Sequence, residues 1–233
     1  MLTLRSHDVE DYVGLRDMDV EDVGTLNEND LACLDELGQY LVSTDAFGRF
    51  GIWLLHKHFE PAAGEVFVER ALVGSRGTET ALIARPAGSA DDLMPTSVRF
   101  DSATDSGVGV IGMEYAAPED FGTISPLSAD DETTLAGIAD LLKAHDKTER
   151  FGVRLLRDPI GISDDEVFLE TCDMAQRTLN CAVIERSDLP SYKTIQTTWE
   201  WTPGLDGSGP TSAPGRVCIY YCLDDPGHSY LHT

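Results

Sequence analysis

The sequence is short of basic residues. Its 17 lysines and arginines stand against 41 aspartates and glutamates, which gives a formal net charge of -24 at pH 7. A surface this negative repels the phosphates of nucleic acids and the headgroups of anionic lipids. We therefore expect neither nucleic acid nor a bare membrane as a partner, and we interpret most of the acidity as solvation of the surface.

The chain also lacks the features of a membrane or secreted protein. It has no run of 18 apolar residues, and its start, MLTLRSHDVEDYVG, has no basic segment followed by an apolar one. Its five cysteines are odd in number and follow no disulfide-framework spacing, so reduced thiols are expected. These observations predict a cytoplasmic protein with free thiols at Cys33, Cys172, Cys181, Cys218 and Cys222.

Common catalytic motifs are missing as well. The sequence contains no GxGxxG, Walker loop, GxSxG, HExxH or CxxC. No dinucleotide-binding, phosphate-binding, nucleophile-elbow or zinc-protease function can therefore be assigned from a motif. Candidate functional residues have to come from patterns particular to this chain.

The most informative pattern is an internal similarity. The stretch FGIWLLHKHFEPAAGEVFVE (Phe50 to Glu69) resembles FGVRLLRDPIGISDDEVFLE (Phe151 to Glu170). With an offset of 101 and no gap, 18 of the 61 positions from Leu26 to Pro86 are identical. Such self-similarity indicates repeated units, and it separates residues that both copies share from residues that only one copy has.

The repeat predicts an α+β fold with an internal duplication: two halves, each one helix and an antiparallel meander of about five strands, packed as one pseudo-twofold unit. A long Gly/Pro/Ser-rich insertion in the second copy predicts a mobile loop. The expected organisation is an acidic N-terminal arm (1–25), a first repeat (26–115), a second repeat (127–223) with the mobile loop (202–216), and a C-terminal tail (224–233).

Individual elements follow from the spacing of apolar residues. Leucines at helical spacing predict a helix that starts at Asn29 or Asp30 and ends near Val42, and its copy should run from about 129 to 144. Residues 49–59 predict a strand with apolar side chains on both faces, as in a strand that is covered on both sides. For the arm, we expect a short strand and an irregular helix.

The strand 49–59 carries the main candidate site. Because His56 and His58 are two residues apart, a strand would present both imidazoles on one face. Glu65 follows on the next strand and could oppose them, whereas Glu60 lies in the turn between. Two histidines and one carboxylate suit a divalent metal ion with open coordination positions. The second copy lacks these histidines, so the candidate metal site belongs to the first repeat only.

Two more histidines, His228 and His232, stand four residues apart in the tail, which could fold over the His56–His58 face and add ligands. Cys218 and Cys222 have the same spacing, but their aromatic strand (CIYYC) is typical of a protein core. Glu65 has a copy in the second repeat, and so do arginines of the same region. Repeated ion pairs that stabilise the strands are therefore the structural alternative for this glutamate.

The His-x-His strand, preceded by Gly51, resembles the metal-binding strand of cupins over about fifteen residues. The spacing departs from that motif, because Glu60 is too near and Glu65 too far, and the predicted helices do not suit an all-β cupin. Helix-plus-meander repeats are also similar to double hotdog, vicinal-oxygen-chelate and cystatin-like architectures. No family is assigned from these resemblances.

The sequence therefore predicts a metal-dependent enzyme that acts on a small organic molecule. A divalent metal ion would be bound by His56, His58 and Glu65, with help from His228 or His232, and would activate water, oxygen or a carbonyl. One alternative is a non-catalytic small-molecule-binding or assembly module. Another is a metal-free acid/base enzyme in which Glu65 orients His56 or His58.

Overall fold

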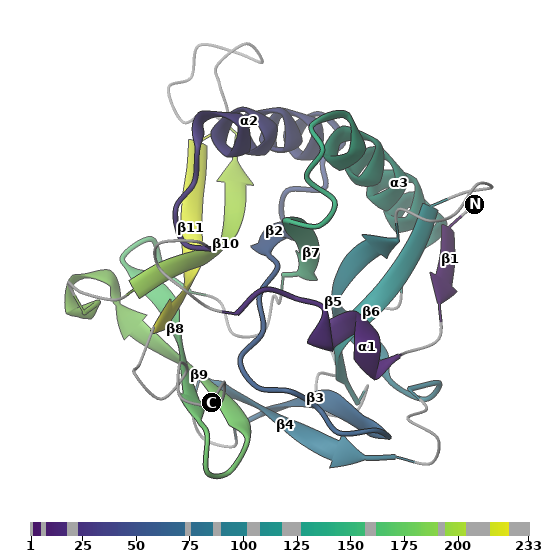
Figure 1. The fold of residues 1–233 in the computed structure, drawn as a ribbon. Helices are drawn as coiled ribbons and strands as arrows, with labels where there is room; N and C mark the ends of the chain where they lie inside the picture. Colours follow the sequence, from purple (N-terminus) through teal and green to yellow (C-terminus); the bar gives the residue numbers. More distant parts are fainter. Residues whose placement is uncertain are drawn as a thin grey trace.

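The computed structural model places the chain in a ring of strands with two long helices on one side (Figure 1). The helices and strands are β1 (Leu2–Arg5), α1 (Val9–Val13), α2 (Glu28–Ser43), β2 (Phe50–Leu54), β3 (Glu65–Ala71), β4 (Thr78–Ala84), β5 (Met94–Asp101), β6 (Val108–Ala116), α3 (Ala129–Ala144), β7 (Phe151–Leu155), β8 (Glu166–Asp173), β9 (Thr178–Glu185), a 3-10 turn (Arg186–Asp188), β10 (Thr194–Thr202) and β11 (Gly215–Leu223). The structure describes residues 2–5, 8–17, 23–72, 76–85, 90–101, 108–117, 127–156, 162–190, 194–203 and 215–223.

The predicted α+β fold is wrong, because the sheet closes on itself as a mixed ten-stranded barrel. The order is β6-β3-β4-β9-β8-β11-β10-β2-β7-β5, and β5 pairs again with β6. The eleventh strand, β1, lies beside β6 outside the ring. Two pairings within the ring, β3–β6 and β8–β11, are parallel, so the predicted purely antiparallel meanders are wrong as well.

The prediction failed because β2 and β7 do not stay with the strands that follow them. β2 lies between β10 and β7, and β7 lies between β2 and β5. Alternation of apolar residues identifies strands and their faces, but it does not say which strands pair. Among the described strands, closure of the ring pairs each of its ten members on both sides, whereas an open sheet would have exposed two long edges.

The offset of 101 reappears in the way the ring closes. Ile52 pairs with Val153 between β2 and β7, and Glu79 pairs with Asn180 between β4 and β9. Both pairs join positions that are 101 residues apart. The matching segments are thus interleaved in one barrel and do not form two separate helix-plus-meander halves.

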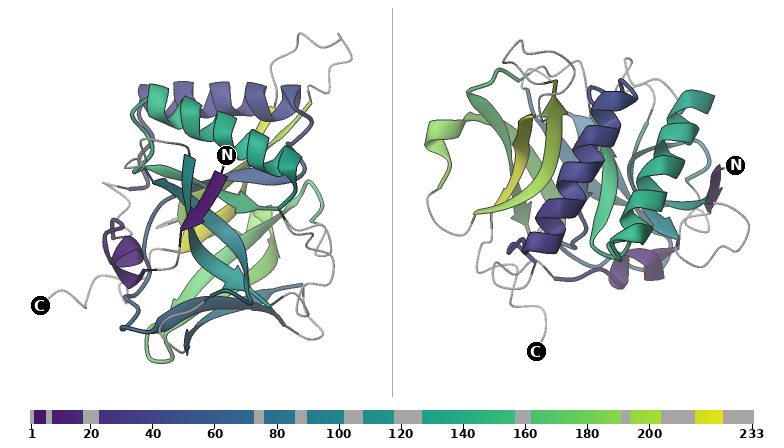
Figure 2. Two further views of the ribbon diagram at one scale, coloured as in Figure 1. Left: turned by 90° about the vertical axis from the view of Figure 1, so that its right-hand side faces the viewer. Right: turned by 90° about the horizontal axis from the view of Figure 1, so that it is seen from above.

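The two long helices form as expected, within one or two residues of the predicted ends. Each begins with a capping box, Asn27 with Asp30 for α2 and Ser128 with Asp131 for α3. Figure 2 shows α2 and α3 side by side over the barrel. No helix among the described residues has both the length and the hydropathy to cross a membrane.

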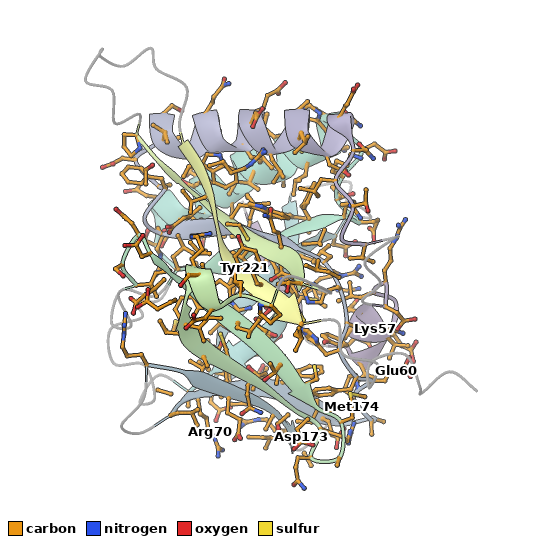
Figure 3. All side chains as sticks on the ribbon, turned by 90° about the vertical axis from the view of Figure 1, so that its left-hand side faces the viewer. Lys57, Glu60, Arg70, Asp173, Met174 and Tyr221 are labelled. Carbon is orange, nitrogen blue, oxygen red and sulfur yellow. The ribbon has the colours of Figure 1, made fainter. Side chains whose placement is uncertain are left out.

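Side chains fill the space between the helices and the barrel and also the inside of the ring (Figure 3). The apolar stripes of α2 and α3 share one buried cluster with residues of β2, β7 and β10, and its members include Leu34, Leu37, Leu41, Phe50, Ile52, Leu135, Ile138, Leu142, Phe151, Val153, Trp199 and Trp201. A second apolar cluster contains Tyr12, Leu15, Trp53, Leu55, Phe59, Phe67, Ile111 and Met113. The first cluster holds the helices on the barrel, and the second joins the N-terminal arm to it.

The tight packing of α2 gives a test of this arrangement. A Cβ built on Gly38 would lie 2.0 Å from Nε1 of the buried Trp201, whereas a Cβ on Gly48 would meet nothing within 4 Å. We expect Gly38→Ala to lower the free energy of unfolding by about 1–3 kcal/mol, because the helix or the indole has to move. Gly48→Ala is the matched control and should change it by less than about 0.5 kcal/mol. Urea denaturation of both variants measures the difference, and equal stabilities would contradict this packing.

Candidate metal centre

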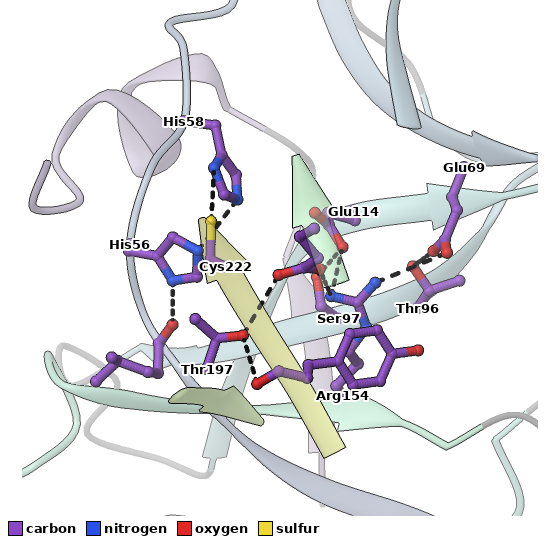
Figure 4. Close-up of polar contacts among 12 residues, drawn as sticks. His56, His58, Glu69, Thr96, Ser97, Glu114, Arg154, Thr197 and Cys222 are labelled. Atoms are coloured by element: carbon purple, nitrogen blue, oxygen red, sulfur yellow. Dashed lines mark hydrogen bonds and ion pairs between the residues drawn. The ribbon is translucent and has the colours of Figure 1, made fainter. Parts of the chain in front are cut away.

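Among the described residues, four side chains from three parts of the chain meet as a group that could bind a metal ion. They are His56, His58, Glu170 and Cys222, and one potential ligand atom of each lies within 4.8 Å of the others. All four are buried, with exposed fractions of 0, 8, 1 and 0% respectively. Figure 4 shows both imidazoles next to the sulfur of Cys222.

The two histidines meet, but not because they share a strand. β2 ends at Leu54, and the chain bends at His58 instead of continuing as the predicted strand 49–59. The rings stand nearly perpendicular, with centroids 4.6 Å apart, and the two Nε2 atoms are 3.1 Å apart. We refer to residues 55–60 as the His loop.

The hydrogen bonds fix one arrangement of protons for two neutral rings. Nδ1 of His56 is 2.6 Å from the carbonyl oxygen of Leu54, which can only accept, so Nδ1 carries the proton and Nε2 carries a lone pair. Nε2 of His58 then donates to Nε2 of His56. Nδ1 of His58 is left as an acceptor, 3.8 Å from the Cys222 sulfur. The lone pair of His56 Nε2 therefore points into the group, where it accepts the hydrogen bond from His58.

Glu170 and Cys222 come from the neighbouring strands β8 and β11, where they are paired in register. Glu170 accepts a hydrogen bond from Arg154 (3.1 Å, to Oε1) and another from Thr197 (3.3 Å, to Oε2). A carboxylate has about four lone-pair positions, so these two bonds leave acceptor capacity on both oxygens. Both bonds also orient the carboxylate for a further ligand.

A buried ionic cluster adjoins the group. The guanidinium of Arg154, 2% exposed, lies 3.1 Å from Glu170, 3.6 Å from Glu114 and 3.7 Å from Glu69. It also stacks over the ring of Tyr220, 4.4 Å from the centroid. One guanidinium cannot neutralise three carboxylates, so the inside of the barrel favours protons or a further cation.

The pKa of Glu170 reflects its burial and the excess of buried carboxylates over the one guanidinium. Burial raises the pKa of its carboxyl to about 7; the Arg154 guanidinium opposes the rise, and the Glu114 and Glu69 carboxylates add to it. Glu170 therefore titrates near neutral pH in the metal-free protein.

The corresponding position of the other copy has the glutamate but not the other ligands. Thr96 donates to Glu69 at 3.3 Å, as Thr197 does to Glu170. The residue paired in register with Glu69 is Ala116, however, whereas the residue paired with Glu170 is Cys222. A sulfur and two imidazoles thus meet only the second of these two glutamates.

The structure does not bring Glu65 into the group. Its carboxylate accepts hydrogen bonds from Arg177 at 3.0 and 2.8 Å and from the backbone N–H of Ala62. The Arg177 guanidinium lowers the pKa of Glu65. The same pair recurs as Arg76 with Glu166, so the repeated glutamates and arginines form reciprocal ion pairs between the matching segments. His228 and His232 lie outside the described residues.

Sequence reasoning missed Glu170 and Cys222. Glu170 was assigned a structural role because it matches Glu69 in the first copy, and residues present in both copies were interpreted as structural. One signal was available: in VFVE and VFLE the glutamate follows the phenylalanine by two residues, so it faces the same side of the strand as a core residue. The partnership of Cys222 with Glu170 depends on the β8–β11 pairing, which the sequence did not reveal.

Comparison with known proteins adds no homologue, since no family model, curated protein or solved structure matches this chain. A function has to be inferred from the buried His56–His58–Glu170–Cys222 group and its surroundings.

The raised pKa of Glu170 predicts how stability depends on pH. Because its folded pKa of about 7 lies above the ordinary value of 4.5 for a glutamic acid, the folded state binds the extra proton, and the stabilisation is lost as the pH rises through this window. In chelator-treated wild type, the free energy of unfolding should fall by roughly 3 kcal/mol between pH 4.5 and 7 because of this group. Glu170→Gln should abolish that fall.

Glu166, four residues earlier on β8, is the control with the opposite sign. Its pKa is lowered to about 2, first by the hydrogen bond from Arg76, so its stabilisation is present above pH 4.5 and is lost as the pH falls towards 2. Urea denaturation of both Glu→Gln variants across pH 2–8 would separate the two effects. An unchanged slope between pH 4.5 and 7 in Glu170→Gln would contradict the assignment.

Proposed function

We propose that this protein binds one divalent transition-metal ion of the zinc type inside its barrel, through His56, His58, Glu170 and Cys222. The observation that carries the proposal is the convergence of four ligand atoms within 4.8 Å of one another in a buried place. Two imidazoles, a thiolate and a carboxylate are all zinc ligands, and four of them complete a tetrahedral shell. The sulfur and nitrogen donors disfavour Mg²⁺ and Ca²⁺, which prefer oxygen.

The surroundings of the ligands support the proposal. A metal-binding histidine commonly donates its other ring N–H to a carbonyl or carboxylate, as His56 does to Leu54. Glu170 is likewise held by Arg154 and Thr197. A divalent cation would also offset the excess of buried carboxylates around Arg154, which a neutral ligand would not.

With all four ligands bound, the ion would have a structural role. The His loop follows β2, whereas Glu170 and Cys222 belong to β8 and β11, so one ion would tie three separate parts of the chain together. Structural zinc sites are closed by four protein ligands and contribute directly to folding stability. A metal-binding, non-catalytic barrel is therefore the function that this geometry supports best.

The metal-dependent enzyme remains as a second candidate because of one observation. Glu170 is bound by Arg154 and Thr197 and has a pKa of about 7. If it stays with these partners, the ion keeps three ligands and an open position, and Glu170 is suited to act as a general base on a metal-bound water or a small organic substrate. Glu170→Gln distinguishes the two: it should weaken metal binding strongly in the structural case and only slightly in the catalytic one.

Metal analysis of protein purified without a His tag tests the proposal. We expect about one ion per chain in the wild type, and loss of the ion in Cys222→Ser and in His56→Ala/His58→Ala, which remove ligands. Zn²⁺ at about 1,000 times its Kd should raise the free energy of unfolding of the wild type by about 4 kcal/mol and leave these variants unchanged.

Two matched controls should retain the ion. Cys218→Ser changes a buried cysteine on the same strand, whose sulfur donates to the carbonyl of Tyr220. His145→Ala removes a histidine at the C-terminal end of α3 that is paired with Glu36 of α2. Equal and negligible metal in the wild type and in all variants, with no stabilisation by added Zn²⁺, would overturn the proposal.

A further inference from the structure

The N-terminal arm reaches the ligand group through a buried tyrosine. Tyr12, on the short helix α1, is 2% exposed, and its ring lies 4.2 Å from that of Phe67 on the barrel. Its hydroxyl oxygen accepts a hydrogen bond of 3.3 Å from the backbone N–H of His58. An element before the first long helix thus contacts the backbone of a candidate ligand directly.

A second set of contacts joins the N-terminal arm to Lys57 of the His loop. Asp17 and Lys57 form an isolated parallel β-bridge, and the N–H of Lys57 donates to the carbonyl of Arg16 at 2.9 Å. The ammonium group of Lys57 donates to the carbonyl of Val13 and forms an ion pair with Asp17 at 3.4 Å. Figure 3 shows Lys57 and Glu60 next to α1 at one side of the barrel.

The other end of the arm is fixed to the barrel wall. β1 pairs with β6, and Asp11 forms ion pairs with Arg5 and Arg99. The arm is therefore anchored at β6 and extends from there to the His loop. We call residues 11–17 the clasp.

The His loop needs such support, because it has left the strand ladder. β2 ends at Leu54, and the N–H of Leu55 still donates to the carbonyl of Arg150. Further along the His loop, the N–H groups of Lys57 and His58 donate to Arg16 and Tyr12 of the clasp. The position of the His58 ring depends on its backbone, and the direction of the ring depends also on its contacts with His56 and Cys222. The clasp therefore sets where this ring stands relative to His56 and Cys222.

We propose that the clasp is the element that holds the His loop in its ligating geometry and limits the rate at which the metal ion leaves, with Tyr12 as the positioning residue. This inference rests on the proposed metal site. It assigns to the acidic N-terminal arm the regulation of metal exchange, and it makes Tyr12 a determinant of affinity without contact to the ion.

Tyr12→Phe tests the inference, because it keeps the ring on Phe67 and removes only the acceptor of the His58 N–H. Tyr115→Phe is the matched control: Tyr115 is 3% exposed, and its hydroxyl group donates to the carbonyl of Gly112, in the cluster with Val66 and Val68. Full-length proteins loaded with Zn²⁺ are mixed with an excess of a chromogenic chelator. We expect release to be about five-fold faster in Tyr12→Phe than in the wild type and unchanged in Tyr115→Phe.

Hydrogen exchange of metal-free protein separates this inference from the metal proposal. In Tyr12→Phe, protection of the Lys57 and His58 amides should fall roughly tenfold, while the amides of α2 keep theirs. Lys57→Met removes the side-chain hydrogen bond and ion pair to the clasp, and it should also lower the protection of these amides. Unchanged protection at both amides would refute the proposed role of the clasp even if the wild type binds Zn²⁺.

The remaining outcomes are decided by the same two measurements. A wild type that binds no Zn²⁺ refutes the metal site and, with it, the role of the clasp in metal exchange. Release rates that are equal in Tyr12→Phe, Tyr115→Phe and the wild type refute that role while leaving the metal site intact. Faster release together with lower amide protection supports it.

Discussion

Closure of the barrel between β2 and β7 is the constraint on which the rest of the structure depends. At this seam each glycine faces a large side chain across the strands: Gly51 pairs with Arg154, and Gly152 pairs with Trp53. A Cβ on Gly152 would come within 2.4 Å of the carbonyl oxygen of Val98 on β5, so β7 can approach its other neighbour, β5, only because no side chain is there. Arg154, the partner of Gly51 at this seam, is itself buried, with an exposed fraction of 2%.

An arginine in that position determines the chemistry of the interior. Buried charge is tolerated only when it is paired, and Glu69, Glu114 and Glu170 supply the partners. These three carboxylates carry more negative charge than the single guanidinium of Arg154 can balance. Glu170 also faces the two histidines and Cys222. The candidate metal centre and the ionic cluster are therefore one connected polar core that shares a single carboxylate.

The sequence was a good guide wherever the determining interactions are local. Leucine spacing gave α2 and α3 nearly to their ends, although the N-caps, Asn27 and Ser128, were not identified. The proximity of His56 and His58 in the chain ensured that they would be neighbours in space. Strand partners depend on contacts between distant segments, so neither the barrel nor the meeting of Glu170 with Cys222 could be read from periodicity. The choice of Glu65 failed for the same reason, since its partner, Arg177, lies more than a hundred residues away.

The ligand group also has a consequence for how the protein is made. His56 and His58 lie in the first third of the chain, whereas Cys222 lies on β11, the last of the described strands. During synthesis the histidines leave the ribosome long before their sulfur partner exists, and the full set of ligands forms only when the final strand has entered the ring. The complete four-ligand set would therefore require β11, and a chain truncated before β11 would lack the Cys222 ligand.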